Sequence, residues 1–135
     1  MNKRAHAIAN GYKSGLEDDI AEMLSAYPGV SFTYESLVLN WEKPSSVHTY
    51  RPDFVIVTQS GKTIVVESKG RWVVADRKKM KLVVQQHPDL DIRMVFQNPR
   101  QKIAKKSETS YAEWCDKNLG IPWAAKTVPP EWLNE

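Results

Sequence analysis

The chain has 135 residues, 41% of them apolar and 26% charged, and a net charge of +3 from 19 basic and 16 acidic residues. This length fits one domain with a real core, and so small a charge excess does not by itself indicate a polyanionic partner. The single Cys115 excludes an internal disulfide, and His6, His48 and His87 lack the spacing of a structural zinc site.

Residues 1–13 are basic, and we expect them to form a flexible arm. They lack the apolar stretch of a signal peptide, and no apolar run in the chain reaches the length of a membrane span. We therefore expect a cytoplasmic protein with no membrane partner. A small-molecule cofactor is not expected either.

Residues 14–27 are predicted to form a helix, because their apolar side chains recur at helical spacing. Ser14 is the expected N-cap, and Pro28-Gly29 ends the helix. Residues 30–36 alternate apolar and polar side chains, which is typical of a strand.

Pro44 to Ser46 break the chain before a second predicted strand, residues 48–57. A turn at residues 59–62 leads to a third strand, residues 63–68, and the two strands are expected to pair as a hairpin. Both strands carry apolar residues on both faces, so both faces of the sheet should be covered.

Residues 75–86 predict a second helix, and residues 91–96 a fourth strand. Residues 109–120 predict a third helix, which Gly120 ends, and residues 130–135 a terminal turn. The core stripe of the second helix is expected to hold Met80, Val83, Val84 and His87, with Arg77, Lys78 and Lys81 on another face. The order α-β-β-β-α-β-α predicts a mixed sheet with helices packed on it.

Charged residues stand where the second and third strands should be buried. Glu67 and Lys69 are two apart in a strand, so they share a face, and strand pairing can bring Asp53 beside Glu67. Two close carboxylates repel unless a proton or a cation lies between them, and Mg²⁺ prefers oxygen ligands. Such an ion activates water and polarises a phosphoryl oxygen, while a lysine stabilises the developing charge. The pattern fits two interpretations about equally well: a metal-dependent nuclease site, and a solvent-exposed ion pair between Glu67 and Lys69.

Two further residues each allow two interpretations. Glu17 is placed to complete a capping box with Ser14, but a helical glutamate facing the sheet would also serve as a metal ligand. Trp72 follows the third strand closely and is expected to be buried, although it could stack on DNA.

Several segments resemble the phage endonuclease I family, the Holliday-junction resolving enzymes of short-tailed phages in the PD-(D/E)xK nuclease superfamily. These segments are SGLED, HTYRPDF, VESKG, DRKKMKLVVQQHPDLDIRMVF, TSYAEWC and PPEWLNE, and the resemblance covers about residues 11–135. It implies a single nuclease domain over residues 14–135, with a restriction-endonuclease-like mixed sheet flanked by helices.

The resemblance also implies an active site. Glu17, Asp53, Glu67 and Lys69 would be the catalytic set, and Lys69 would assist the water or the charged transition state. Asp53 would contact two divalent ions, with Glu67 and the Ser68 carbonyl completing one ion site and Glu17 reaching the other. The expected ion is Mg²⁺, with Mn²⁺ able to substitute.

The family implies a domain-swapped homodimer in which each site combines the helical glutamate of one chain with the sheet residues of the other. Residues 39–50 would then bridge the subunits, with Pro44 stiffening the crossing.

Basic residues gather in two clusters, either of which could be ordinary solvated surface. Cations near a helix N-terminus, where negative charge is preferred, favour phosphate binding given the nuclease interpretation. The expected DNA contacts are Arg71, Arg77, Lys78, Lys81, Arg100, Lys102, Lys105 and Lys106.

The resulting hypothesis is a structure-selective endodeoxyribonuclease that hydrolyses four-way and branched DNA during phage recombination, in the cytoplasm of the infected host. The alternatives are a restriction or repair nuclease acting on linear duplex, and a non-catalytic junction-binding protein.

Two departures from the family are expected to matter. The turn between Asp53 and Glu67 is longer, and the chain lacks a basic tail after Glu135, which predicts weaker non-specific DNA affinity.

Overall fold

The computed structural model describes residue 7 and residues 10–43 and 46–135. The elements are α2 Gly15–Ala26, β1 Ser31–Tyr34, β2 Leu39–Lys43, β3 Ser46–Tyr50, β4 Phe54–Val57, β5 Thr63–Lys69, α3 Val74–Gln86, β6 Ile92–Phe96, α4 Tyr111–Asn118, β7 Trp123–Ala125 and α5 Pro130–Leu133. Within this part of the chain, no helix has the length and apolar character needed to cross a membrane.

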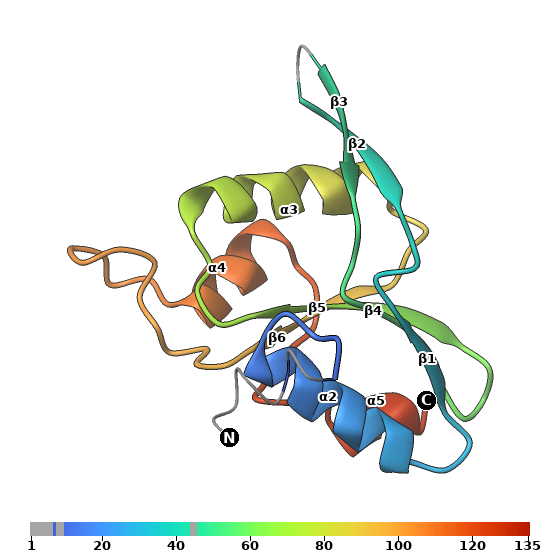
Figure 1. Ribbon diagram of the computed structural model, residues 1–135. Helices are drawn as coiled ribbons and strands as arrows, with labels where there is room; N and C mark the ends of the chain where they lie inside the picture. The colour runs from blue at the N-terminus through green and yellow to red at the C-terminus, as the bar shows by residue number, and fades with distance from the viewer. Residues whose placement is uncertain (1–6, 8–9, 44–45) are drawn as a thin grey trace.

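Five strands form a mixed sheet in the order β1-β4-β5-β6-β7. The first three strands in this order pair antiparallel, whereas β5, β6 and β7 pair parallel. Helices α2 and α5 lie on one side of the sheet and α3 and α4 on the other (Figure 1). The predicted mixed sheet with helices on both faces is therefore confirmed.

The two faces of the sheet carry two separate apolar cores, and β5 contributes to both. One core joins the sheet to α2 and α5, and contains Leu16, Ile20, Leu24, Phe54, Ile56, Ile64, Val66, Val95, Val128 and Leu133. The other joins the sheet to α3 and α4, and contains Val65, Trp72, Met80, Val83, Ile92, Met94, Phe96, Tyr111 and Cys115. Burial of successive β5 residues on opposite faces makes this strand the rigid centre of the domain.

The predicted β4–β5 hairpin is present, and its register pairs Phe54 with Val66. Its turn is closed by Gly61, whose φ of +90° suits glycine because a side chain disfavours that conformation. At the start of this turn, Thr58 and Ser60 donate hydroxyl hydrogen bonds to the main-chain oxygen of Glu135. The turn thus lies at the end of the hairpin opposite Asp53.

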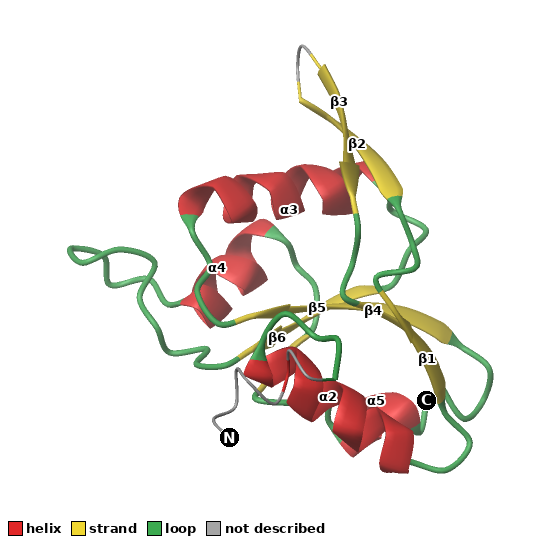
Figure 2. Cartoon of the chain, in the orientation of Figure 1, coloured by secondary structure: helices red, strands yellow, loops and turns green. Residues whose placement is uncertain are grey.

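The single strand predicted over residues 48–57 is wrong, because the chain forms two strands in different sheets. β3 pairs with β2 in a separate two-stranded sheet, which stands apart from the main sheet (Figure 2). Residues 51–53 separate β3 from β4, and Pro52 has no N–H to donate to a strand ladder. The short strands β2 and β7 were not predicted.

Most other predicted elements are confirmed: α2 with Ser14 as its N-cap, β1, β5, α3, β6 and α4. In the stripe predicted for α3, Met80 and Val83 are buried, while Val84 and His87 are half-buried. The expected burial of Trp72 is also confirmed, with 0% of the residue exposed.

The expectation that Arg77 shares an exposed face with Lys78 and Lys81 is wrong. Arg77 is only 7% exposed, and its Nη1 donates to the Trp72 carbonyl oxygen at 2.7 Å. Its guanidinium also lies 5.7 Å from the ring centroid of Trp114. A charged side chain turns inward here because a carbonyl and an aromatic face replace part of its hydration.

Part of the expected N-terminal arm lies outside the described residues. The described part packs against the domain rather than extending from it. Ala7 is fully buried, and the ring of Tyr12 lies 4.7 Å from that of Tyr34.

Candidate active site

Asp53 and Glu67 meet at the end of the β4–β5 hairpin. Asp53 directly precedes β4, and Glu67 lies near the end of β5, one position beyond the Phe54–Val66 pair. The Asp53 N–H donates to Oε1 of Glu67 at 3.3 Å. The strand register therefore brings the two acids together, as the sequence pattern predicted.

Ser68 holds Asp53 through two hydrogen bonds. Its N–H and its hydroxyl both donate to Oδ2 of Asp53, at 2.9 and 2.8 Å. Hydrogen bonds to an ionised carboxylate are among the stronger ones in proteins. The sequence analysis assigned only the Ser68 backbone to the site, so the contribution of this side chain was missed.

Glu17 reaches the same place from the first turn of α2. The Ser14 hydroxyl caps this helix by accepting the Glu17 N–H at 3.1 Å, while Oε2 of Glu17 accepts from the Tyr34 hydroxyl at 2.7 Å. Glu17 is only 5% exposed. Ser14 therefore caps the helix through the Glu17 N–H, whereas the Glu17 carboxylate accepts from Tyr34 and not from the Ser14 N–H, so only half of the expected capping box is observed here.

Glu35 is an acid of this site that the sequence analysis missed. One carboxylate oxygen each from Glu17, Glu35 and Asp53 lie within 4.8 Å of one another, a spacing that could hold a metal ion. The Glu35 N–H donates to the Asp53 carbonyl oxygen at 3.0 Å, and its carboxylate pairs with the Lys13 ammonium at 2.7 Å. The available signal was its position directly after β1, which pairs with the strand that follows Asp53.

Burial raises the pKa of the two buried acids of the candidate site. Desolvation, and then the charge of Asp53, raises the pKa of Glu67 well above its ordinary range. The same two causes raise the pKa of Glu17. Because each effect disfavours another negative charge, this group of acids fits a divalent cation, which would allow the carboxylates to ionise together.

Lys69 and Tyr50 complete the inner part of the site. The Lys69 ammonium lies 3.5 Å from Oδ2 of Asp76 in the first turn of α3. Tyr50, at the end of β3, is 2% exposed, and its hydroxyl has no hydrogen-bond partner in the described part of the chain.

These groups line one pocket of about 350 Å³. Its lining contains Glu17, Glu35, Tyr50, Asp53, Glu67, Ser68 and Lys69, together with the cations Lys13, Arg51 and Lys79. Acids and cations around one open volume can bind a divalent ion and an anionic group side by side.

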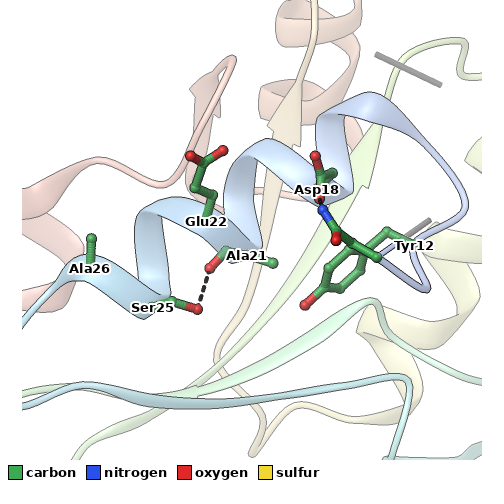
Figure 3. A pocket seen from close by; sticks show the side chains of 7 residues that line it. Tyr12, Asp18, Ala21, Glu22, Ser25 and Ala26 are labelled. Atoms are coloured by element: carbon green, nitrogen blue, oxygen red, sulfur yellow. Dashed lines mark hydrogen bonds between the residues drawn. The ribbon is translucent and has the colours of Figure 1, made fainter. Parts of the chain in front are cut away.

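A larger pocket of about 670 Å³ lies along α2 and contains none of the predicted site residues (Figure 3). Tyr12 lies beside the Asp18 end of its lining, while Ser25 and Ala26 lie at the other end. Oδ1 of Asp18 accepts from the Asn10 amide at 2.9 Å. This pocket is therefore separate from the predicted catalytic residues.

The predicted DNA-binding cations lie outside the active-site pocket. Seven of them are exposed: Arg71, Lys78, Lys81, Arg100, Lys102, Lys105 and Lys106. The loop that carries the last four joins β6 to α4 and projects from the body of the domain (Figure 1). Arg77, by contrast, is buried as described above.

Comparison with known proteins identifies the family. The profile of the family described as phage endonuclease I matches residues 1–135. Endonuclease I of Escherichia phage T7 is 45% identical over 124 residues, covering 92% of this chain and 79% of that protein. Endodeoxyribonuclease 1 of Enterobacteria phage T3 is 43% identical over 124 residues, covering 92% of this chain and 78% of that protein. The chain therefore belongs to the phage endonuclease I family and is an endonuclease.

Proposed function

We propose that the protein is a Mg²⁺-dependent endodeoxyribonuclease that resolves four-way and other branched DNA during phage recombination, in the cytoplasm of the infected host. The main observation behind this proposal is that one pocket is lined by Glu17, Asp53, Glu67 and Lys69. Family membership supports the nuclease activity, and the name of the T3 relative, an endodeoxyribonuclease, supports DNA as the substrate.

The acids of the pocket are the groups that would hold the metal. Asp53, Glu67 and the Ser68 carbonyl would bind one ion, and Asp53 with Glu17 would bind a second. Glu35 is close enough to contribute to that second position. A bound Mg²⁺, or Mn²⁺ in its place, supplies an activated water and neutralises charge on the phosphate.

The protein residues would supply positioning and charge. Two hydrogen bonds from Ser68 hold Asp53, so little reorganisation is needed when the site binds its ligands. Lys69 would orient the attacking water or stabilise the negative charge that develops on the phosphate. Its contact with Asp76 keeps the ammonium at the pocket before substrate arrives.

Substrate choice would come from backbone geometry rather than from bases. The exposed cations on α3 and on the loop between β6 and α4 are suited to contact phosphates of the DNA arms. We therefore expect little preference for base sequence.

The proposed enzyme is a homodimer in which residues 39–50 form the bridge between subunits. In the described chain, residues 39–43 and 46–50 form the paired strands β2 and β3, while Pro44 lies outside the described residues. Glu17 lies beside Asp53 of the same chain. Domain swapping exchanges identical elements between protomers, so it would preserve these contacts while drawing them from two chains.

The test compares a labelled four-way junction with its matching linear duplex, in Mg²⁺ or in EDTA. Wild type, Glu67→Gln and the matched control Glu131→Gln are assayed for cutting and for binding. Glu131 is exposed on α5, so its substitution should leave cutting unchanged.

The expected result is Mg²⁺-dependent nicking near the branch that is lost only in Glu67→Gln, while junction binding survives. Binding without any cutting by the wild type would favour a non-catalytic junction binder. Equal cutting of the linear duplex would favour a restriction or repair nuclease.

A further inference from the structure

Tyr50 presents an unusual polar group in the active-site pocket. Its residue is 2% exposed, and its side chain packs in the core formed with α3 and α4. Within the described residues, its hydroxyl has no hydrogen-bond partner. A buried hydroxyl without a partner is uncommon in a folded protein, because it loses water and gains nothing in exchange.

The hydroxyl of Tyr50 can donate a hydrogen bond, because a phenol carries its proton at neutral pH. The Lys79 ammonium lies 5.0 Å from the centroid of the Tyr50 ring, which helps to hold the ring in place.

The Glu67 carboxylate offers an acceptor for the Tyr50 hydroxyl. Its Oε1 accepts the Asp53 N–H at 3.3 Å. That hydrogen bond does not use Oε2, and Tyr50 and Glu67 line the same pocket. The site therefore contains a buried donor near a carboxylate oxygen that does not accept the Asp53 N–H.

We propose that Tyr50 is a positioning residue whose hydroxyl donates to the Glu67 carboxylate when a divalent ion is bound. This inference rests on the proposed function in one respect, the use of Glu67 as a metal ligand. Groups that hydrogen-bond a ligating side chain fix its orientation, and their loss typically lowers metal affinity about 10–100-fold. Tyr50 would thus act on metal binding through Glu67.

The test is Tyr50→Phe, which keeps the aromatic ring and removes only the hydroxyl. Binding of Mn²⁺ is measured by electron paramagnetic resonance in the absence of DNA. We expect affinity about tenfold below wild type, with an unchanged midpoint of thermal unfolding in EDTA. The matched control is Tyr27→Phe. The Tyr27 hydroxyl donates to Oδ1 of Asn134 at 2.6 Å, and neither residue lines this pocket.

A double variant tests whether Tyr50 acts through Glu67. In a Glu67→Gln background, Tyr50→Phe is expected to cause no further loss of Mn²⁺ affinity, because the carboxylate it orients is gone. A full additional tenfold loss there would overturn the inference.

Two other results would also overturn it. One is wild-type affinity in Tyr50→Phe, and the other is an equal loss in Tyr27→Phe. The proposed function fails separately: a wild type that binds Mn²⁺ but cuts no DNA would refute the nuclease proposal. A selective loss of Mn²⁺ binding in Tyr50→Phe would still support the role of Tyr50 in that case.

Discussion

Ser68 binds Asp53 twice at the same atom, with its N–H 2.9 Å and its hydroxyl 2.8 Å from Oδ2. Neither of these two hydrogen bonds uses Oδ1 of Asp53. Ser68 thus holds one oxygen of the acid and leaves the other for a ligand. The side chain at position 68 therefore contributes to the preorganisation of the site.

Ser68→Ala should lower Mn²⁺ affinity and the rate of DNA cleavage by roughly three- to tenfold. The expected size follows from losing one hydrogen bond, worth about 0.5–1.5 kcal/mol, while the N–H contact remains. Calorimetric titration and single-turnover cleavage would measure the two effects. Ser68→Thr keeps a hydroxyl and is expected to restore most of the loss; equal defects in both variants would contradict this role for the hydroxyl.

Glu67→Gln should stabilise the protein in EDTA at pH 7 by about 1–2 kcal/mol, because it removes a buried carboxylate whose ionised form is disfavoured. Burial and Asp53 raise the pKa of Glu67, so the folded state binds this proton more tightly than the unfolded state. The wild-type free energy of unfolding therefore falls as pH rises from the ordinary glutamate pKa of 4.5 towards the raised value.

Urea unfolding at pH 4 and pH 7 would check this prediction. The stabilisation should be larger at pH 7, and the exposed control Glu131→Gln should show neither effect. Adding a divalent ion should stabilise wild type more than Glu67→Gln, because binding to the folded state shifts the equilibrium. A Glu67→Gln variant less stable than wild type at pH 7 would refute the argument.

Lys78→Gln should affect DNA binding but not stability, whereas Arg77→Gln should affect stability but not the salt dependence of DNA binding. Lys78 is exposed on α3, so its loss should change the free energy of unfolding by no more than about 0.5 kcal/mol. It should reduce the slope of log affinity for DNA against log salt concentration by about one. Arg77 is buried against Trp72 and Trp114, so its loss should cost about 1–3 kcal/mol of stability and leave the salt slope unchanged.

Urea unfolding and DNA binding titrated at several salt concentrations would separate these two effects. A reduced salt slope in folded Arg77→Gln would mean that this side chain leaves its buried position to contact phosphate. An unchanged slope in Lys78→Gln would exclude Lys78 from the DNA interface.

Arg93→Met should destabilise the protein at pH 7 and flatten its acid denaturation. The buried Arg93 guanidinium binds both Asp91 and Glu135, at distances of 2.6 to 2.9 Å. Arg93, and then Lys62, lowers the pKa of Glu135 from 4.5 to about 2. A lowered acid pKa gives stability that is present above the ordinary value and is lost as pH falls towards the folded value.

We therefore expect wild type to lose stability between pH 4.5 and about 2, and Arg93→Met to lose less in that interval. The loss at pH 7 should be about 1–3 kcal/mol, the range for hydrogen bonds to charged groups. Thermal unfolding across pH, with the exposed Arg100→Met as control, would measure both. Parallel pH profiles for wild type and Arg93→Met would contradict the assignment.

The sequence predicted the elements whose signals are local. α2 and α4 have serine N-caps and regular apolar spacing, and β5 and β6 are short apolar runs. β2 and β7 were missed because they are short and partly exposed, so their side chains alternate weakly. The break at residues 51–53 was missed because apolar residues continue on both sides of it.

The sequence could predict that Asp53 lies beside Glu67, because the pairing of two neighbouring strands determines that contact. Glu35 was not predictable, because its position depends on β1 pairing with a strand far along the sequence. Arg77 was misplaced because charge patterning assumes that cations remain in solvent, whereas two tryptophans form its environment here. Tyr50 gave no signal, since an unpaired hydroxyl is a property of the folded state alone.

The position of β5 between two apolar cores also determines how the site should respond to thermal fluctuation. Glu67 and Ser68 pair with Met94 and Val95 of β6, so exposing their amides requires both helical layers to open. Their amide hydrogens should exchange with solvent only through global unfolding. Glu17 lies in the first turn of α2, where fraying is cheaper, so its amide should exchange sooner. In the candidate active site, the amide hydrogens on the central strand should thus exchange slowly and those on the helix faster.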